Sequence, residues 1–222
     1  MHIPDGFLEV KTWVGTGAVS LGVLMYAIKK SKNSLNDRQV PALGVMAAFI
    51  FAAQMINFPV APGASGHLLG AALATILLGP WNAGIIISSV LLIQRLFFQD
   101  GGLTALGANI FNMAVVGTFA ALCVYRLITA INSSKAGKIA ASFAAAWFSV
   151  VTASLAAGLE LVMSGIGTLN SLIPVILGWH MLIGIGEGII TAVVVSIVSA
   201  YGANRFNEEG EGKNYYEETT AG

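Results

Sequence analysis

The chain has 222 residues, of which 56% are hydrophobic and only 10% are charged, and its mean hydropathy is +0.78. Because a soluble domain carries about 25% charged residues, this composition excludes a water-exposed globular protein and predicts a polytopic protein of the lipid bilayer. The net charge is zero, so the sequence carries no basic excess that would indicate nucleic acid as a partner.

The first ten residues, MHIPDGFLEV, differ from a cleaved signal peptide. A signal peptide needs basic residues before its apolar core, whereas this stretch holds Asp5 and Glu9 and no basic residue. The large side chain of His2 also disfavours removal of the initiator methionine. We therefore expect the N-terminus to remain intact, with a free amine on Met1.

Seven apolar stretches could form membrane-spanning helices, each of which needs roughly 20 residues. In chain order they cover approximately residues 12–29, 40–57, 67–78, 81–98, 103–131, 138–163 and 176–201. The third stretch is short because Gly79-Pro80 ends it. The sequence therefore predicts an all-α fold whose membrane-embedded domain is formed by residues 1–201.

Lysine and arginine are distributed unevenly among the connecting segments. With the N-terminus outside, nine of them fall on the cytoplasmic side, and only Lys11 and Arg95 fall near the outer side. The positive-inside rule therefore predicts an outer N-terminus and a cytoplasmic C-terminus. Residues 202–222 contain five glutamates and few aliphatic residues, which predicts a disordered acidic tail in the cytoplasm.

The first two residues can chelate a metal through three nitrogens. The Met1 amine, the deprotonated backbone nitrogen of His2 and the His2 imidazole would form adjacent five- and six-membered rings, and His67 is the candidate for a fourth nitrogen. Four nitrogens in a plane suit Ni(II) or Cu(II), whereas zinc prefers a tetrahedron and magnesium or calcium prefers oxygen. Because amines and imidazoles also bind protons, metal binding should weaken in acid. From these residues alone, a solvated terminal histidine and a hydrogen-bonding loop histidine remain alternatives.

Polar residues near the predicted outer loops could orient these ligands, because a metal-bound imidazole commonly donates its second N–H to an oxygen. Solvated loop residues are the alternative reading, and Asp5 could instead tether the terminal segment. The candidates for this supporting role are Asp5, Asn57, Ser65, Gln99 and Asp100.

Glu187 lies within the last apolar stretch, where a charge indicates a functional or hydrogen-bonding role. It could be a protonated acid that is bonded to a backbone carbonyl, to Asn109 or to Asn112. His180 lies seven residues earlier, on roughly the same helical face. Because it could line the pocket or sit at the outer interface beside Trp179, we do not include it among the ligands.

Three motifs occur in order along the chain: MHIPDGFL at the start, PVAPGASGHLLGAALA after the second apolar stretch and LFFQDGGLTALGANIFNMAVVG at the fifth. Together they resemble the substrate-capture membrane subunit of nickel and cobalt energy-coupling-factor transporters, the CbiM/NikM family, over about residues 1–200. The resemblance implies seven membrane helices and an N-terminus that inserts into a pocket from outside. It also implies a square-planar nitrogen site formed by Met1, His2 and His67.

The resemblance further implies an ATP-driven importer in the prokaryotic cell membrane, of which this chain is the substrate-specific, non-enzymatic subunit. The implied partners are a transmembrane coupling protein, cytoplasmic ATPase subunits and a small accessory membrane subunit. The chain holds no Walker A pattern, GxxxxGK[ST], so ATP would be hydrolysed on a partner. Pro4-Asp5-Gly6 is similar to nickel-type members, whereas cobalt-type members more often have Met-Glu-Gly. Ni(II) is thus the favoured substrate and Co(II) the alternative.

Other functions stay open at this point. The chain could be a cobalt-specific capture subunit that serves cobalamin synthesis, or an autonomous carrier that couples metal to ion movement through Glu187. An intramembrane enzyme with Glu187 and His180 as an acid–base pair is disfavoured because no nucleophile accompanies them.

Overall fold

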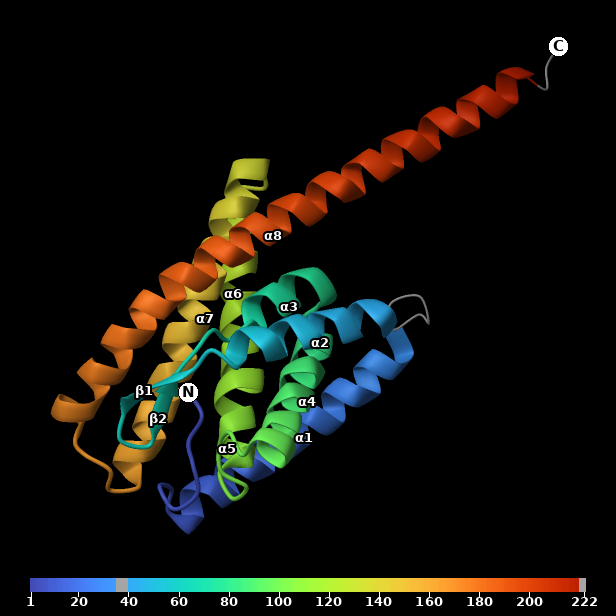
Figure 1. Cartoon of the computed structure of the whole chain (residues 1–222). Helices are drawn as coiled ribbons and strands as arrows, with labels where there is room; N and C mark the ends of the chain where they lie inside the picture. The colour runs from blue at the N-terminus through green and yellow to red at the C-terminus, as the bar shows by residue number, and fades with distance from the viewer. Residues whose placement is uncertain (35–39, 220–222) are drawn as a thin grey trace.

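A computed structural model describes residues 1–34 and 40–219 of the chain (Figure 1). Helices α5, η2 and α6 follow one another without a break, so this part of the chain forms seven helices, as predicted. A two-stranded hairpin is added to them. The elements are α1 (Val10–Ser34), α2 (Val40–Gln54), β1 (Phe58–Ala61), β2 (Ala64–Gly66), α3 (Ala71–Leu78), α4 (Pro80–Phe98), α5 (Leu106–Ile110), the π-helical η2 (Phe111–Val116), α6 (Gly117–Ile131), α7 (Lys135–Met163) and α8 (Leu169–Thr219).

The helices differ greatly in length. Among the described residues, four helical segments are long and apolar enough to cross a membrane, whereas α2 has 15 residues and α3 has 8. Gly79 separates α3 from α4 with a φ of 83°, and Pro80 begins α4, as Gly79-Pro80 predicts. The four segments are Pro80–Phe98, Leu106–Ile131, Lys135–Met163 and Leu169–Tyr201.

Helix α8 begins earlier and ends later than the predicted stretch 176–201. It accommodates Pro174 within its first two turns and continues to Thr219. The predicted disorder of the tail stays a prediction, and its last residues, 220–222, lie outside the described part of the chain.

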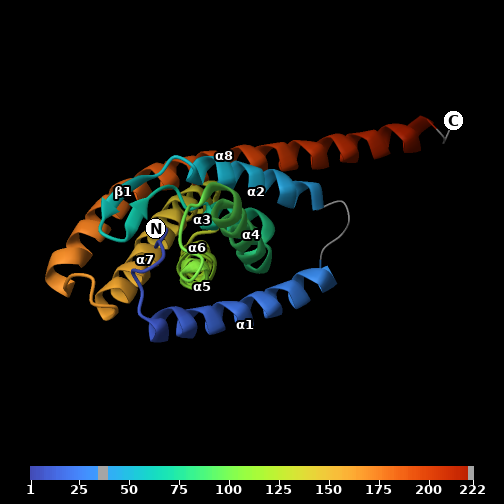
Figure 2. The ribbon, with the colours of Figure 1, turned by 60° about the horizontal axis from the view of Figure 1, so that its bottom comes forward.

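The sequence predicts a loop after the second helix, but the structure forms the β1–β2 hairpin there. The strands are antiparallel, with Phe58 opposite Gly66. Gly63 supplies the turn with a φ of 74°, a conformation that glycine adopts without steric cost. Figures 1 and 2 both place the N-terminus beside this hairpin, so residues distant in sequence meet here.

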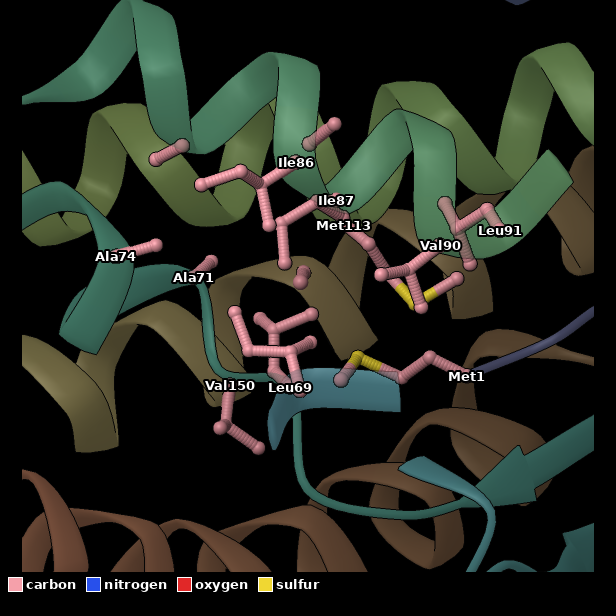
Figure 3. Close-up of a cluster of buried hydrophobic side chains, with 14 residues drawn as sticks. Met1, Leu69, Ala71, Ala74, Ile86, Ile87, Val90, Leu91, Met113 and Val150 are labelled. Carbon is pink, nitrogen blue, oxygen red and sulfur yellow. The ribbon is translucent and has the colours of Figure 1, made fainter. Parts of the chain in front are cut away.

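The side chain of Met1 belongs to the largest apolar cluster of the interior. It is fully buried and belongs to one cluster with Leu69, which precedes α3, and with residues of α2, α3, α4 and η2, among them Val90 and Met113 (Figure 3). Burying a methionine side chain contributes roughly 1.5–3 kcal/mol. The apolar end of the first residue therefore fixes the place of its amine.

Candidate metal centre

The chain begins inside the protein. Met1 and Ile3 are fully buried and His2 is buried. The side chain of Asn109 pairs with the main chain of Ile3 as a neighbouring strand would, accepting from its N–H at 2.9 Å and donating to its carbonyl at 3.1 Å. The N–H of Gly102 also donates to the Ile3 carbonyl, at 2.8 Å. These bonds align the first residues across the bundle.

Asp5 tethers the end of this segment to the loop before α5. Its carboxylate accepts from the N–H of Leu103 at 2.9 Å and from the N–H and hydroxyl of Thr104 at 2.7 and 2.6 Å, and Arg95 lies 3.3 Å away. The bonds to Thr104 and Leu103 and the Arg95 charge lower the pKa of Asp5 despite some desolvation. These contacts agree with the tethering role.

Ser65 in β2 binds the amine of Met1. The Met1 amine donates to the carbonyl oxygen of Ser65 and, at 3.2 Å, to its Oγ, while the His2 N–H donates to the same Oγ at 3.1 Å. Burial lowers the pKa of the amine from 8.0 to about 4, although the Asp100 carboxylate acts in the opposite direction. The amine is therefore neutral at neutral pH and keeps a nitrogen lone pair.

His2 and His67 each direct one unprotonated nitrogen into the interior. Gln94 Oε1 lies 3.1 Å from His2 Nε2, and the Leu68 carbonyl lies 2.7 Å from His67 Nδ1. Because these oxygens accept, the contacted nitrogens carry the hydrogen. His2 Nδ1 and His67 Nε2 are left with lone pairs, and both are buried without a hydrogen-bond partner among the described residues.

The two imidazoles lie against one another, with 4.5 Å between ring centroids. Burial, followed by the charge that the Met1 amine carries when it is protonated, lowers the pKa of His2 to about 3, and the bond to Gln94 acts in the opposite direction. Burial and then the same amine also lower the pKa of His67 well below 6.5. Three neutral nitrogen donors thus meet in one buried space.

Asp100 borders this space. Its Oδ1 lies 3.5 Å from His2 Nδ1, and its Oδ2 accepts from Asn57 Nδ2 at 2.7 Å. Burial raises the pKa of Asp100, while the nearby amine and the bonds from Asn57 and Gly101 lower it. Since the His2 nitrogen and the carboxylate both accept, a cation between them would satisfy both.

A cavity of about 330 Å³ opens over His2. Gln99 and Asp100 line it together with Asn57 and Ser65, so four of the five predicted supporting residues border one opening. Gln99 is exposed there, and Asp5 acts at the tether instead. Of the three residues proposed as ligands, His2 is the one that lines this cavity.

The predicted partners of Glu187 were wrong. Its carboxylate accepts from the main-chain N–H groups of Leu69 at 2.5 Å and Gly70 at 2.9 Å, beside His67. Asn109 holds Ile3 instead, and Asn112 donates to a second buried carboxylate, that of Glu160 in α7, at 2.7 Å. Glu187 therefore positions the chain that carries His67.

Sequence reasoning also missed Gln94, Asn109 and the burial of His180. Asn109 lies within the third motif, but its role could not be read from it, because each of these residues is defined by a contact to a distant main-chain or side-chain atom. In the described part of the chain, no three His, Cys, Asp or Glu side chains lie close enough to hold a metal ion. A metal at this centre would therefore depend on main-chain nitrogens as well as side chains.

Comparison with known proteins finds relatives that are named for the transport of nickel and of cobalt. Over 203 residues the chain is 44% identical to the putative fused nickel transport protein NikMN of Archaeoglobus fulgidus, covering 90% of this chain and 66% of that protein. Over 133 residues it is 44% identical to the cobalt transport protein CbiM 1 of Pelobacter propionicus, covering 59% and 58%. The chain thus spans about two thirds or less of the length of these relatives.

A crystal structure of a truncated transition metal transporter superposes with a TM-score of 0.86 at 35% identity, covering 90% of this chain and 99% of that one. This similarity confirms the predicted polytopic all-α membrane fold. Residues 2–204 match a family described as the cobalt uptake substrate-specific transmembrane region. The predicted transport subunit, as opposed to an enzyme, and the predicted prokaryotic membrane location are confirmed by this match. The chain therefore belongs to the CbiM family of cobalt and nickel uptake proteins.

Proposed function

We propose that the chain is the substrate-capture subunit of an ATP-driven energy-coupling-factor importer and that it binds Ni(II) from the outer side. One observation carries the proposal. The Met1 amine, His2 Nδ1 and His67 Nε2 meet in one buried space, and burial keeps all three unprotonated at neutral pH.

The His2 backbone nitrogen lies between the first two donors and completes the set. Binding then requires the loss of only the amide proton, since the other three nitrogens already have free lone pairs. The chelate through the amine, the amide and the imidazole holds its three donors nearly in a plane, and His67 closes the square. Square-planar nitrogen coordination suits Ni(II).

The choice of nickel has two supports. The first is the planar nitrogen set, and the second is Pro4-Asp5-Gly6, which is similar to nickel-type sequences. Co(II) is the alternative substrate, and relatives of the chain carry names of both metals. Titration of the purified chain with each metal separates these alternatives, and tighter binding of Co(II) would reverse the assignment.

We further propose a transmembrane coupling protein, cytoplasmic ATPase subunits and a small accessory membrane subunit as partners. The chain covers 66% of a relative named as a fused NikMN protein. The part of that relative that the match does not cover leaves room for an accessory unit fused to its capture region.

An autonomous ion-coupled carrier is less well supported. In that reading Glu187 would bind and release the coupling ion, but both of its oxygens already accept main-chain N–H groups. Metal accumulation by vesicles containing this chain alone, without ATPase partners, would favour the carrier.

The decisive experiment adds one alanine before Met1. The added residue moves the free amine out of the chelate and places a peptide bond where the amine lies, so stoichiometric Ni(II) binding should be lost. A matched control adds one alanine after Gly222, and thermal unfolding of both proteins verifies the fold. His67→Ala should also weaken binding strongly. An N-terminally extended protein that still binds one Ni(II) per chain, measured by calorimetry and metal content, would refute the proposed chelate.

A further inference from the structure

Another cavity, of about 260 Å³, lies between the start of α7 and the later part of α8. These two helices pack against one another. The cavity shares no lining residue with the opening over His2, so it is a separate feature of the molecule. Its polar lining consists of Lys135 and Lys138 of α7 and of Ser196 and Ser199 of α8.

The cavity lies where two membrane spans end. The apolar span of α7 begins at Lys135, and that of α8 ends at Tyr201, close to both serines. Lipid headgroups occupy this level, because a bilayer is about 30 Å thick in its hydrocarbon core and about 40–45 Å thick with its headgroups. The positive-inside rule predicts that this end faces the cytoplasm.

The polar lining of the cavity is basic. Lys135 and Lys138 are three residues apart and therefore share one face of α7. No carboxylate is among the described residues that line the cavity, and the ion pairs of the described chain join other residues. Ser196 and Ser199 add two hydroxyl groups from α8 with the same spacing. Two ammonium groups and two hydroxyl donors suit an anionic group with several oxygens, such as a phosphate.

The remaining walls of the cavity are apolar. Val195 is buried and Ile139 is half-buried there. An inorganic anion would gain nothing from these walls, whereas a phospholipid would place its glycerol and the start of its acyl chains against them. A basic pocket between membrane helices at headgroup level is typical of anionic lipid binding. The lining therefore favours a lipid over a free anion.

We propose that this cavity binds the headgroup of an anionic phospholipid. Lys135 and Lys138 are the cationic partners of its phosphate, and Ser196 and Ser199 donate hydrogen bonds to the phosphate oxygens. Because the lipid contacts both helices, it stabilises the packing of α7 against α8 by mass action. In the described chain, none of the proposed metal ligands lines this cavity, so the lipid site is independent of the chelate.

The test measures lipid binding by the purified full chain in detergent, with equal amounts of anionic phosphatidylglycerol and zwitterionic phosphatidylcholine. Native mass spectrometry counts the retained lipids, and we expect the wild type to retain phosphatidylglycerol preferentially. In Lys135→Gln/Lys138→Gln its affinity should fall about 30-fold, since each lysine near a lipid phosphate contributes about fivefold. The matched control is Lys29→Gln/Lys32→Gln, which removes two exposed lysines with the same spacing from α1. Its affinity should change by less than about threefold, because charges distant from the lipid are screened.

Three results would overturn the lipid site. Equal retention of both lipids by the wild type would mean that the chain does not select the anionic headgroup, whether or not the variants fold. Unchanged retention in the cavity variant, or an equal loss in the control, would mean that this cavity does not hold the lipid. Displacement of the lipid by millimolar inorganic phosphate would assign the cavity to a free anion. Ni(II) binding should be the same in all three proteins, so failure of the metal proposal would leave the lipid proposal standing.

Discussion

Two segments of chain meet at the candidate centre, and they are held in different ways. Residues 1–5, the terminal segment, enter the bundle from a free end and are retained by the buried Met1 side chain and by bonds to Ser65, Asn109 and the loop before α5. Residues 67–70, the fixed loop, are continuous with the hairpin on one side and with α3 on the other, and Glu187 binds the main chain of Leu69 and Gly70.

This difference indicates how a metal could be captured and released. The terminal segment provides three of the four proposed nitrogens and can withdraw without unfolding a helix, whereas His67 is held in place. A metal that binds only the inserted form stabilises insertion by mass action. Insertion and metal binding should therefore vary together, while the fixed loop changes little.

The largest loss of Ni(II) affinity is expected when insertion of the terminal segment is blocked and the proposed ligands are left unchanged. A Cβ on Gly102 would lie 2.5 Å from the Asp5 nitrogen and 2.7 Å from the carbonyl carbon of Pro4. Gly102→Ala should therefore displace the terminal segment. A loss of about 3 kcal/mol corresponds to a roughly 100-fold weaker affinity, which calorimetry measures.

Gly178→Ala provides the matched control, because a Cβ on Gly178 would meet no atom within 4 Å. Its affinity should equal that of the wild type. If Gly102→Ala binds Ni(II) as tightly as the control does, the terminal segment has no role in capture.

The second-largest loss of Ni(II) affinity is expected when the inserted terminal segment is held less tightly. Asn109→Leu removes both side-chain bonds to the Ile3 main chain and leaves that main chain partly unpaired. The expected loss of about 1–3 kcal/mol corresponds to a roughly 10- to 100-fold weaker affinity. The thermal midpoint without metal should fall less than that with metal, because the bonds serve the inserted segment. Equal falls would mean that Asn109 supports the fold instead.

The Ni(II) affinity should depend on pH through the terminal segment, because the Met1 amine and the His2 imidazole both belong to it. The Met1 amine has a pKa of 8.0 when free and about 4 when inserted, and His2 has 6.5 and about 3. Because the withdrawn segment binds these protons more tightly, acid favours withdrawal, and insertion is fully favoured above pH 8. This linkage should lower the apparent affinity by up to about tenfold per pH unit below 8, and more steeply below 6.5, in addition to the roughly tenfold per unit that release of the His2 amide proton contributes. Constant affinity between pH 5 and 8, measured at fixed ionic strength, would contradict this linkage.

The smallest effect on metal binding is expected from the fixed loop. Glu187→Gln leaves one oxygen for the N–H groups of Leu69 and Gly70 and introduces an NH₂ donor beside them. The free energy of unfolding should fall by about 1–3 kcal/mol, while the Ni(II) affinity of the folded protein should change by less than about threefold. A larger loss of affinity would mean that the fixed loop also has to move, and it would remove the contrast.

How much of the fold could be predicted from the sequence depends on how far apart in the chain the interacting residues lie. Helices such as α4 and α7 were predicted because hydropathy is a local property, and Gly79-Pro80 correctly separated α3 from α4. The β1–β2 hairpin was missed because its strands have four and three residues, too few to show an alternating pattern.

The candidate site divides in the same way. Met1 and His2 are adjacent, so their chelate can be derived from the sequence, and His67 followed from topology and the family motif. Asn109 lies 106 residues from Ile3 and Glu187 lies 118 from Leu69. Both bind main-chain atoms, which every residue possesses, so no sequence pattern indicates the pairing. The buried place of His180 depends on the packing of α8 against β2 in the same way.

The complete burial of Met1 has a consequence for the maturation of the protein. Its amine donates to two oxygens of Ser65, and no surface of the residue is exposed. A formyl or acetyl group on that nitrogen would need space within the closed interior and would remove the basic lone pair. Under the proposed chelate, a chain that keeps such a group on the Met1 nitrogen should therefore not bind Ni(II), and removal of the group becomes a condition of metal capture.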